Sequence, residues 1–326
     1  MSILKSLQQH FATASVNHTA QIQSLWSHYG SIDRYNVNGS PVVVKSIEIP
    51  QAQQHPRGWH TNVGHQRKIR SYQIEKNWYR NHQTDHGVSY LMPRLIAIID
   101  GDHQDQFSLV LSDLDASGFC IRPKRANLSQ IKLMIQWLAQ LHGQHLTKKA
   151  DNNAIKDYWL HGSYWHLSTR PDELDAMANG KLRAYANEIS LQLDNCLYQT
   201  IIHGDAKLAN FCIHNSETKV AAVDFQYVGN GVGVKDLVYL LGSCLNAQQL
   251  SQHHPTLVDY YFAQLQQYSE HLTNHFDDLQ QQWRRLIPYA YADFERFLAG
   301  WAPEHIKRNE FTDNMTRKAI TDIELG

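Results

Sequence analysis

The stretch that decides the fold reads Ile202-His203-Gly204-Asp205-Ala206-Lys207-Leu208-Ala209-Asn210, and Val223-Asp224-Phe225-Gln226 follows it. Its informative polar residues are Asp205, Asn210 and Asp224, separated by five and then fourteen residues. Short apolar runs typical of buried strands adjoin them, so these side chains are expected where strands end. Carboxylate and amide oxygens are ligands that Mg²⁺ prefers, because it is a hard cation. The stretch therefore predicts a loop that holds a metal ion beside one separate carboxylate.

Asp205 is the candidate base of this loop, because a strand and a glycine precede it and would expose its carboxylate. Asn210 and Asp224 are the candidate metal ligands. Lys207 would neutralise a transferred phosphate, and its plainer interpretation is a solvated lysine of the loop. A turn rich in Asp and Asn with helix caps is the plainer interpretation of the whole set. That interpretation explains neither the spacing nor the neighbouring strands.

Composition bounds the class of protein. A length of 326 residues fits two packed units or one elaborated domain. The formal net charge of −1 argues against a nucleic-acid partner, since such proteins usually carry a basic field. We expect no membrane span and no signal peptide, because no long apolar run occurs. Four widely spaced cysteines without a C-x-x-C pair indicate reduced thiols and a cytoplasmic protein.

The pattern along the chain changes from strand-rich to helical. Before residue 112 we expect a helix at 3–17, strands near 22–26, 32–37 and 42–44, a helix at 66–81, and strands at 90–99 and 107–111. Asn38-Gly39 predicts a tight hairpin, because both residues tolerate positive φ. Later helices are expected at 128–141, 172–197, 234–250, 255–286 and 288–299, with short strands at 200–202, 211–213 and 220–223. The predicted division is 1–111, a connection at 112–118, and 119–326.

A second set of charged residues lies in the strand-rich part. Lys45 ends the Val42-Val43-Val44 strand, where a lysine can grip the α- and β-phosphates of a nucleotide. Glu75, on the next predicted helix, is its expected partner across a polar loop. The plainer interpretation is an exposed lysine and an exposed glutamate. The segment 27–31, where a phosphate-covering loop is expected, holds the single glycine Gly30 and is a weak signal.

The chain resembles the aminoglycoside phosphotransferase and choline kinase superfamily, and within it most nearly the ecdysteroid-kinase-like group of small-molecule kinases. The resemblance covers nearly the whole chain and rests on residues 44–45, 75, 109–114, 137–142, 164–170, 203–210, 224–226, 235–237 and 293–301. It implies an α+β, protein-kinase-like, two-lobed fold, with a small antiparallel-sheet N-terminal lobe and a larger, mainly helical C-terminal lobe. The N-terminal lobe at 1–111 would bind the nucleotide. The residues 112–118 would form the hinge, and 119–326 would carry the catalytic loop and the acceptor site.

The resemblance also implies ATP and Mg²⁺ as cofactors, and transfer of the γ-phosphate to a hydroxyl of a small molecule. Backbone groups at Ser112, Asp113 and Leu114 would then bind adenine. His203 and Asp236 would support the catalytic loop. Ser112 stands where the group often has glutamate, which is harmless if the contact is through backbone.

The segment after Asp224 favours a small acceptor over a protein substrate. Protein kinases follow this aspartate with a long activation segment that ends in A-P-E. Here Asp236 arrives twelve residues later without that motif, and glycines at 229, 231 and 233 punctuate the link. A nucleotide-binding pseudokinase or scaffold without turnover is the alternative function, and a metal-dependent phosphohydrolase is a third.

The acceptor itself is not readable from the sequence. Trp165, Tyr289, Asp293 and Trp301, with further aromatic residues nearby, would form an aromatic and acidic pocket suited to a quaternary amine. The same aromatic residues would also enclose a steroid or another apolar alcohol. Core packing between helices is their plainer interpretation.

Overall fold

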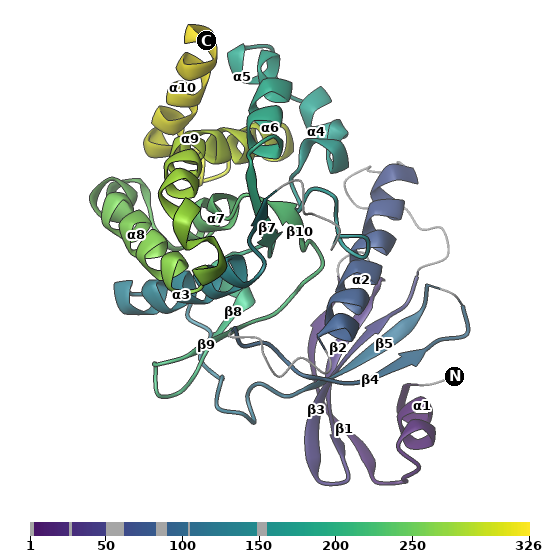
Figure 1. The fold of residues 1–326 in the computed structure, drawn as a ribbon. Helices are drawn as coiled ribbons and strands as arrows, with labels where there is room; N and C mark the ends of the chain where they lie inside the picture. Colours follow the sequence, from purple (N-terminus) through teal and green to yellow (C-terminus); the bar gives the residue numbers. More distant parts are fainter. Residues whose placement is uncertain (1–2, 26–27, 50–61, 83–89, 104, 149–154) are drawn as a thin grey trace. The chain divides into compact units, whose positions relative to one another are not determined.

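The computed structural model describes residues 3–25, 28–49, 62–82, 90–103, 105–148 and 155–326, which are drawn in colour in Figure 1. The chain separates into two compact units. The first unit comprises Met1–Gly87 and Met92–Ile121, and the second comprises Val88–Leu91 and Arg122–Gly326, as far as these ranges are described. The predicted hinge at 112–118 belongs to the first unit.

The first unit is built on an antiparallel sheet. Among its described residues the five strands run in the order β1-β2-β3-β5-β4. Their bounds are Val16–Ser24, Gly30–Val37, Ser40–Ile47, Leu95–Asp100 for β4 and Phe107–Ser112 for β5. Helices α1 (Ile3–His10) and α2 (Asn62–Asn81) contact the sheet, α1 at β1 and β4 and α2 at β4. The predicted hairpin at Asn38-Gly39 joins β2 to β3, with φ of +52° and +85° at the two residues.

The core of the first unit contains two of the three consecutive valines of β3. Val42 and Val44 are buried together with Val37 of β2 and Val110 of β5, and Leu7 of α1 packs on the same cluster. Pleated strands send alternate side chains to one face, so Val42 and Val44 point to this core. Lys45, one position on, belongs to the opposite face.

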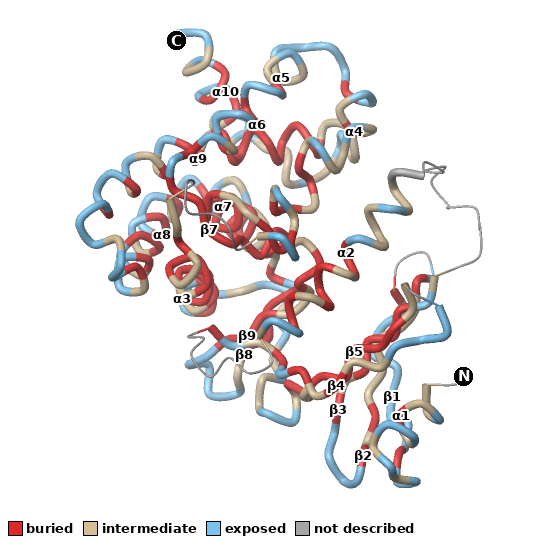
Figure 2. Tube along the Cα trace, turned by 45° about the vertical axis from the view of Figure 1, so that its right-hand side comes forward, coloured by how far each residue is buried: buried red, intermediate tan, exposed pale blue. Residues whose placement is uncertain are grey.

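The second unit is mainly helical. Its longer helices are α3 (Leu128–Gln144), α6 (Ala186–Asp194), α7 (Val234–Cys244), α8 (Ala247–Gln267), α9 (Phe276–Trp301) and α10 (Glu310–Leu325). Its shorter elements are β6 (Thr147–Lys148), α4 (Pro171–Asp175), α5 (Lys181–Ala184), β7 (Tyr198–Ile202), β8 (Phe211–Ile213), β9 (Val220–Ala222) and β10 (Gly229–Gly231). Helix α9 packs against α4, α6, α7 and α10. Strand β7 and most of α7 are buried, as the red stretches of Figure 2 show.

The N-terminal sheet followed by a mainly helical part confirms the predicted α+β class, but some element bounds differ from the predictions. Helix α1 ends at His10 and β1 begins at Val16, where a single helix over 3–17 was predicted. Eight of the nine residues of β1 are exposed, so the strand lacks the alternation that would identify it. The helix predicted at 255–286 is interrupted, because α8 ends at Gln267 and α9 begins at Phe276. Pro288 lies inside α9 rather than at the start of a helix.

No helix of the described chain combines the length and the apolar character that a membrane crossing requires. The four cysteines are all free thiols in the structure.

Buried His254 on α8 makes the stability of the second unit depend on pH. Its ring lies 5.7 Å from that of Tyr291 and 5.1 Å from that of Phe311, measured between centroids. Burial, helped by the charge of Lys318, lowers the pKa of His254 from 6.5 to about 4. Because the folded-state pKa is depressed, this contribution to stability is present above about pH 6.5 and is lost as the pH falls toward 4.

Replacing His254 by phenylalanine should remove this titration. Between pH 7 and pH 4, we expect the free energy of unfolding of His254→Phe to fall by about 3 kcal/mol less than that of the wild type. Urea unfolding at each pH measures this difference. The matched control is His253→Gln, at the more exposed neighbouring position, which should follow the wild type. Parallel curves for His254→Phe and the wild type would contradict the account of a buried, neutral ring.

Candidate active site

The loop after β7 begins with a conformation that only glycine adopts easily. β7 is buried and pairs with β10, so the chain leaves a fixed strand at His203. Gly204 has a φ of +76°. A Cβ atom there would collide with the carbonyl oxygen of Tyr227 and the amide nitrogen of Ser163. The glycine before Asp205 is therefore required both by its backbone angle and by the chain packed against it.

A buried carboxylate holds this loop in place. Asp236, near the start of α7, accepts hydrogen bonds from the backbone N–H of His203 at 2.6 Å and of Gly204 at 3.0 Å. It is completely buried. Since a carboxylate only accepts, Nε2–H of His142 donates to it at 3.2 Å, and the hydroxyl of Tyr261 then donates to Nδ1 of His142 at 2.8 Å. Residues of three helices, α3, α7 and α8, thereby fix the start of the loop.

The two oxygens of Asp205 have different surroundings. Oδ2 accepts from Nζ of Lys207 at 2.7 Å and from Nδ2 of Asn210 at 3.0 Å. Oδ1 is buried and accepts no hydrogen bond of good geometry from the described residues, and the hydroxyl of Tyr239 interacts with the same carboxylate. Burial raises the pKa of the Asp205 carboxyl; Lys207 opposes this and Asp224 adds to it. One oxygen is thus held in place while the other is available to a hydroxyl.

The candidate metal ligands are connected to the same loop. The N–H of Val223 donates to the carbonyl of Asn210 at 2.9 Å, and Nε2–H of His203 donates to the carbonyl of Val223 at 3.0 Å. His203 thereby links the loop to the residue before Asp224. Asp224 itself has a φ of +70°, and its Oδ1 accepts from Gln226 at 2.5 Å. The structure therefore brings Asp205, Asn210 and Asp224 together.

This donor set fits magnesium. Because Nδ2 of Asn210 donates to Asp205, the amide oxygen is the atom left to face a cation. Asp224 offers a carboxylate, and all ligand atoms are hard oxygens. The negative charge of Asp224 raises the pKa of Lys207 in concert with Asp205, against the lowering effect of burial.

Within the first unit, Lys45 and Glu75 form the expected pair. Nζ of Lys45 lies 2.6 Å from Oε2 of Glu75. The two side chains are buried, so the interpretation as exposed residues does not hold. Burying either charge alone would be costly, whereas the pair satisfies both.

The predicted hinge residues make local contacts within the first unit. Oγ of Ser112 accepts from the N–H of Arg94 at 2.8 Å. The carboxylate of Asp113 binds Nε of Arg34 at 2.6 Å, which raises the pKa of that guanidinium. The carbonyl of Leu114 accepts from Phe119 N–H at 2.8 Å. The side chains of Ser112 and Asp113 thus hold neighbouring parts of the same unit. In the phosphate-loop segment, Gly30 begins β2, and Ser27 lies outside the described residues.

Residues 72–274 match the ecdysteroid kinase-like family. This range is more than half of the 326 residues. The chain belongs to the ecdysteroid kinase-like family. No curated protein sequence matched the chain.

Solved structures show the same fold at low identity. A proposed aminoglycoside phosphotransferase from Ralstonia eutropha has a TM-score of 0.54 and 12% identity, over 98% of this chain and 94% of that one. An ethanolamine kinase from Plasmodium vivax has 0.51 and 10%, over 94% and 82%. A thermostable mutant of aminoglycoside phosphotransferase APH(4)-Ia has 0.50 and 10%, over 97% and 99%. The predicted family and the protein-kinase-like α+β fold are therefore confirmed.

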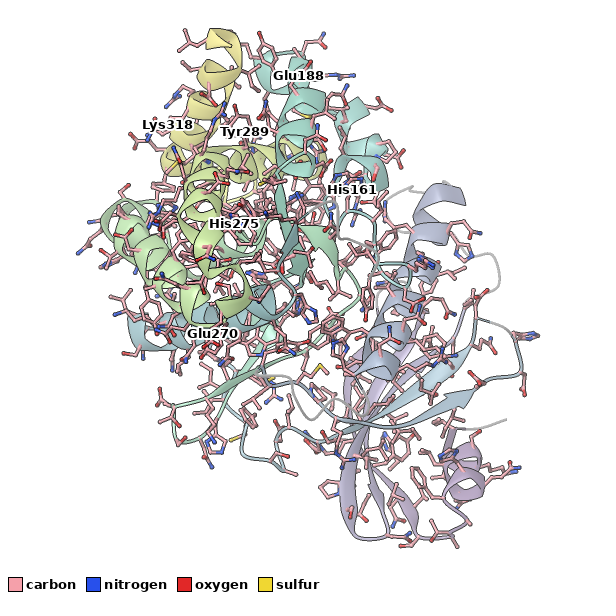
Figure 3. All side chains as sticks on the ribbon, viewed as in Figure 1. His161, Glu188, Glu270, His275, Tyr289 and Lys318 are labelled. Atoms are coloured by element: carbon pink, nitrogen blue, oxygen red, sulfur yellow. The ribbon has the colours of Figure 1, made fainter. Side chains whose placement is uncertain are left out.

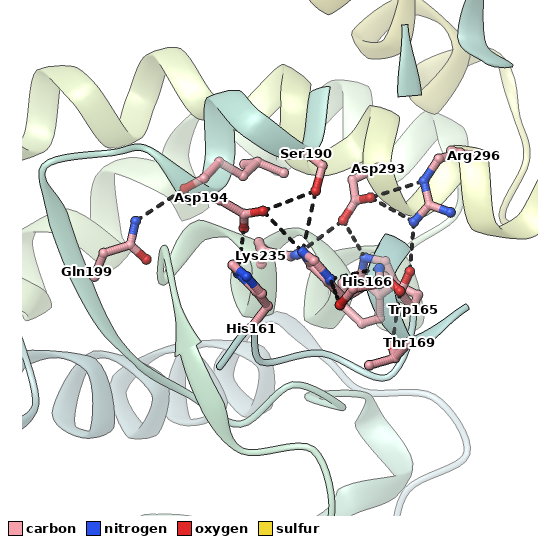
Figure 4. Close-up of polar contacts among 12 residues, drawn as sticks. His161, Trp165, His166, Thr169, Ser190, Asp194, Gln199, Lys235, Asp293 and Arg296 are labelled. Carbon is pink, nitrogen blue, oxygen red and sulfur yellow. Dashed lines mark hydrogen bonds and ion pairs between the residues drawn. The ribbon is translucent and has the colours of Figure 1, made fainter. Parts of the chain in front are cut away.

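Two of the predicted acceptor residues lie in a buried ion cluster of this family member (Figure 4). Oδ2 of Asp293 is 3.1 Å from both Nε1 of Trp165 and Nζ of Lys235, and Oδ1 accepts from Nη2 of Arg296 at 2.8 Å. Although burial alone would raise it, Lys235 and Arg296 lower the pKa of Asp293 to about 2. Trp165 is 0% exposed and Asp293 is 1% exposed. This differs from the expected acidic pocket, because the carboxylate is already paired inside the protein.

The other two predicted acceptor residues are not brought to one place. Tyr289, labelled in Figure 3, is buried on α9 and donates to Oδ2 of Asp322 on α10 at 2.6 Å. Trp301 is partly buried and packs on the apolar cluster that contains Trp165. Its ring stacks on Phe297 at 5.6 Å between centroids. Trp301 therefore packs on the same apolar cluster as Trp165, whereas Tyr289 connects α9 to α10 through its hydrogen bond to Asp322.

Two residues beside Asp205, Tyr239 and Lys307, were not among the predicted site residues. Tyr239 on α7 donates to the hydroxyl of Tyr164 at 3.3 Å, and burial together with the charge of Asp205 raises the pKa of both tyrosines. Lys307 has its Nζ 4.5 Å from the centre of the Tyr239 ring. Tyr239 was detectable, because it follows Asp236 by three residues on one helix. Lys307 lies between α9 and α10, outside any periodic segment, so no pattern signals it.

A further polar cluster joins His161 and His166, on either side of Trp165, to Asp194 at the end of α6, as Figure 4 shows. Asp194 binds Nδ1 of His161 at 3.1 Å through one oxygen and Nε2 of His166 at 3.2 Å through the other. The three side chains offer ligand atoms within 4.8 Å of one another. The two imidazole rings are stacked at 4.4 Å and 3°, however, so their in-plane lone pairs do not point at a common ion. The arrangement is that of two rings hydrogen-bonded to one carboxylate.

Replacing Asp236 by asparagine should destabilise the protein. The amide of asparagine can accept through only one oxygen, and its NH₂ group would face one of the buried backbone N–H groups. We expect Asp236→Asn to lower the free energy of unfolding by about 2–4 kcal/mol. Urea unfolding measures this. The matched control is Asp259→Asn, whose partner Arg284 forms an exposed ion pair and whose loss should cost less than about 1 kcal/mol. Equal effects in the two variants would contradict the bracing role of Asp236.

Proposed function

We propose that this ecdysteroid kinase-like protein is an ATP- and Mg²⁺-dependent phosphotransferase that moves the γ-phosphate of ATP to a hydroxyl group of a small molecule. The observation that carries the proposal is the buried Oδ1 of Asp205, which accepts no hydrogen bond of good geometry from the described residues and belongs to the same loop as Asn210. Membership of the ecdysteroid kinase-like family adds support, because that family is named for kinases.

In the proposed reaction, Asp205 orients the acceptor hydroxyl and receives its proton as the hydroxyl oxygen attacks the γ-phosphorus. The bond from that phosphorus to the bridging oxygen breaks, and ADP leaves with the electron pair. Asn210 and Asp224 would hold Mg²⁺, which when bound neutralises charge on the phosphate oxygens. Lys207 holds Oδ2 of Asp205 and adds positive charge beside the transferred group.

The nucleotide is assigned to the N-terminal lobe at 1–111. Lys45 would bind the α- and β-phosphates of the nucleotide. Its ion pair with Glu75 holds the ammonium group in one position. Backbone groups at Ser112 to Leu114, in the hinge at 112–118, would bind adenine. The lobe at 119–326 would carry the catalytic loop and the acceptor.

The acceptor is assigned as a small molecule rather than a protein or nucleic acid. Part of the segment between Asp224 and Asp236 is a strand of the fold, because Gly229–Gly231 forms β10 and pairs with β7. It therefore offers little chain for a peptide platform. The similar structures include an ethanolamine kinase, which is named for a small alcohol. The free thiols suit a cytoplasmic location. A nucleotide-binding scaffold without turnover is the alternative, favoured only by the single glycine, Gly30, in the segment 27–31.

Asp205→Asn should reduce turnover by roughly 10²–10⁴-fold, because the amide cannot take up the hydroxyl proton. The measurement is Mg²⁺-dependent release of ADP in the presence of a mixture of hydroxylated metabolites. The control is Asp259→Asn, which removes an exposed carboxylate elsewhere on the second unit. Near-normal turnover of a folded Asp205→Asn protein would remove the residue from the reaction.

Asp224→Ala should separate metal binding from nucleotide binding. A non-hydrolysable ATP analogue at a hundred times its dissociation constant should stabilise the wild type by about 2.7 kcal/mol. We expect Mg²⁺ to strengthen this stabilisation in the wild type and not in Asp224→Ala. Lys45→Met should weaken the analogue with or without Mg²⁺. A normal magnesium effect in Asp224→Ala would exclude Asp224 as a ligand.

A further inference from the structure

Lys307 is a half-buried lysine whose ammonium has no carboxylate partner in the part of the chain that the structure describes. Its Nζ lies 4.5 Å from the ring centre of Tyr239 on α7 and 5.6 Å from that of Phe294 on α9. The aromatic faces attract the charge but do not neutralise it. Burial lowers the pKa of Lys307 to about 8, although Asp205 acts in the opposite direction. A bound anion would compensate for the water that this ammonium has lost.

The side chain belongs to the surroundings of Asp205. Asp205 acts electrostatically on Lys307, and also on the hydroxyls of Tyr164 and Tyr239, which lie 3.3 Å apart. The backbone N–H of Tyr164 in turn donates to the carbonyl of Gly204 at 3.1 Å. The two tyrosines and Lys307 therefore lie near the carboxylate of Asp205.

No carboxylate on the neighbouring described elements pairs with the positive charge of Lys307. The other cations there are each paired at 2.7–3.1 Å: Lys207 with Asp205, Lys235 and Arg296 with Asp293, Arg308 with Glu295, and Arg170 with Glu173. Cys244 also faces Lys307, and burial raises its pKa to about 11, so it stays a neutral thiol. A cationic acceptor would meet an uncompensated positive charge, whereas an anionic acceptor would complete a pair.

We propose that Lys307 is a specificity-determining residue that binds an anionic group of the acceptor, a carboxylate or a phosphate, near the hydroxyl that faces Asp205. The inference rests on the proposed kinase function and names the class of its acceptor. That acceptor is a hydroxy acid or a phosphorylated alcohol, and amino alcohols are disfavoured by repulsion from the ammonium. The aromatic rings of Tyr239 and Phe294 position the ammonium, as cation–π contacts do in partly desolvated sites.

A matched series of three-carbon alcohols tests the proposal. Glycerate is anionic, glycerol is neutral and serinol is cationic, while glycerol 3-phosphate distinguishes a phosphate from a carboxylate. Each probe is titrated into the full-length protein with Mg²⁺ and a non-hydrolysable ATP analogue, at constant ionic strength, and stabilisation gives its dissociation constant. We expect at least one anionic probe to bind the wild type at least tenfold more tightly than glycerol, and serinol to bind least.

The variants identify the residue responsible. Lys307→Met should weaken the preferred anionic probe at least tenfold and leave glycerol unchanged, whereas Lys307→Arg should retain most of the preference. Lys318→Met, which removes an exposed lysine on α10, is the control and should bind as the wild type does. A structural role alone would not raise the pKa of Lys307 on addition of the probe. NMR of ¹³Cε-labelled lysine should detect that rise.

Other outcomes would overturn the inference. These are tighter binding of glycerol or serinol, no binding of either anionic probe, or equal anion binding by Lys307→Met. An equal loss of turnover with all acceptors in Lys307→Met would assign the lysine to the transferred phosphate instead. If the ATP analogue binds and only the anion preference fails, the kinase proposal stands. If the analogue gives no stabilisation and no ADP forms from ATP, the kinase proposal fails.

Discussion

The candidate active site depends on one buried carboxylate. Asp236 accepts from two successive backbone N–H groups, those of His203 and Gly204, where the chain leaves β7. His142 and Tyr261 extend this contact to α3 and α8. A buried carboxylate with three donors is satisfied, so it fixes the loop instead of opposing folding. Once the loop is fixed, the orientation of Asp205 follows, since Lys207 and Asn210 hold one oxygen, while the other accepts no hydrogen bond of good geometry from the described residues.

The same site illustrates how charge is distributed in the helical unit. Asp293, a carboxylate that sequence reasoning assigned to the acceptor, is neutralised by Lys235 and Arg296 inside the core. Lys307 has no carboxylate partner among the described residues, and Asp205 acts on it electrostatically. The acidic group, Asp293, is therefore paired inside the protein, whereas the basic group, Lys307, lies near the loop of Asp205 without a carboxylate partner among the described residues. This is the reverse of what an acceptor site for amines requires.

The candidate catalytic loop could be located from the sequence because its residues lie close together along the chain. Asp205, Asn210 and Asp224 lie at short spacings beside strands, and the contacts among Asp205, Asn210, His203 and Val223 join the same segments. The pair of Lys45 and Glu75 could be predicted, because the next predicted helix offers few acidic partners for a lysine at a strand end. The ion cluster around Asp293 was not predictable, because its members come from α7, α9 and the segment before α4. Polar β1 and the irregular segment that holds Lys307 carry no periodicity, so sequence reasoning misjudged the first and missed the second.

The most direct measurement follows the terminal phosphate of ATP. ATP that carries an isotopic label in its γ-phosphate is incubated with the protein, Mg²⁺ and a pool of hydroxylated small molecules, and the products are separated. If the protein is a small-molecule kinase, the label appears in an organic phosphate ester. Label found only in inorganic phosphate would indicate a phosphohydrolase, and label that stays in ATP would indicate a scaffold. Either result would contradict the central claim.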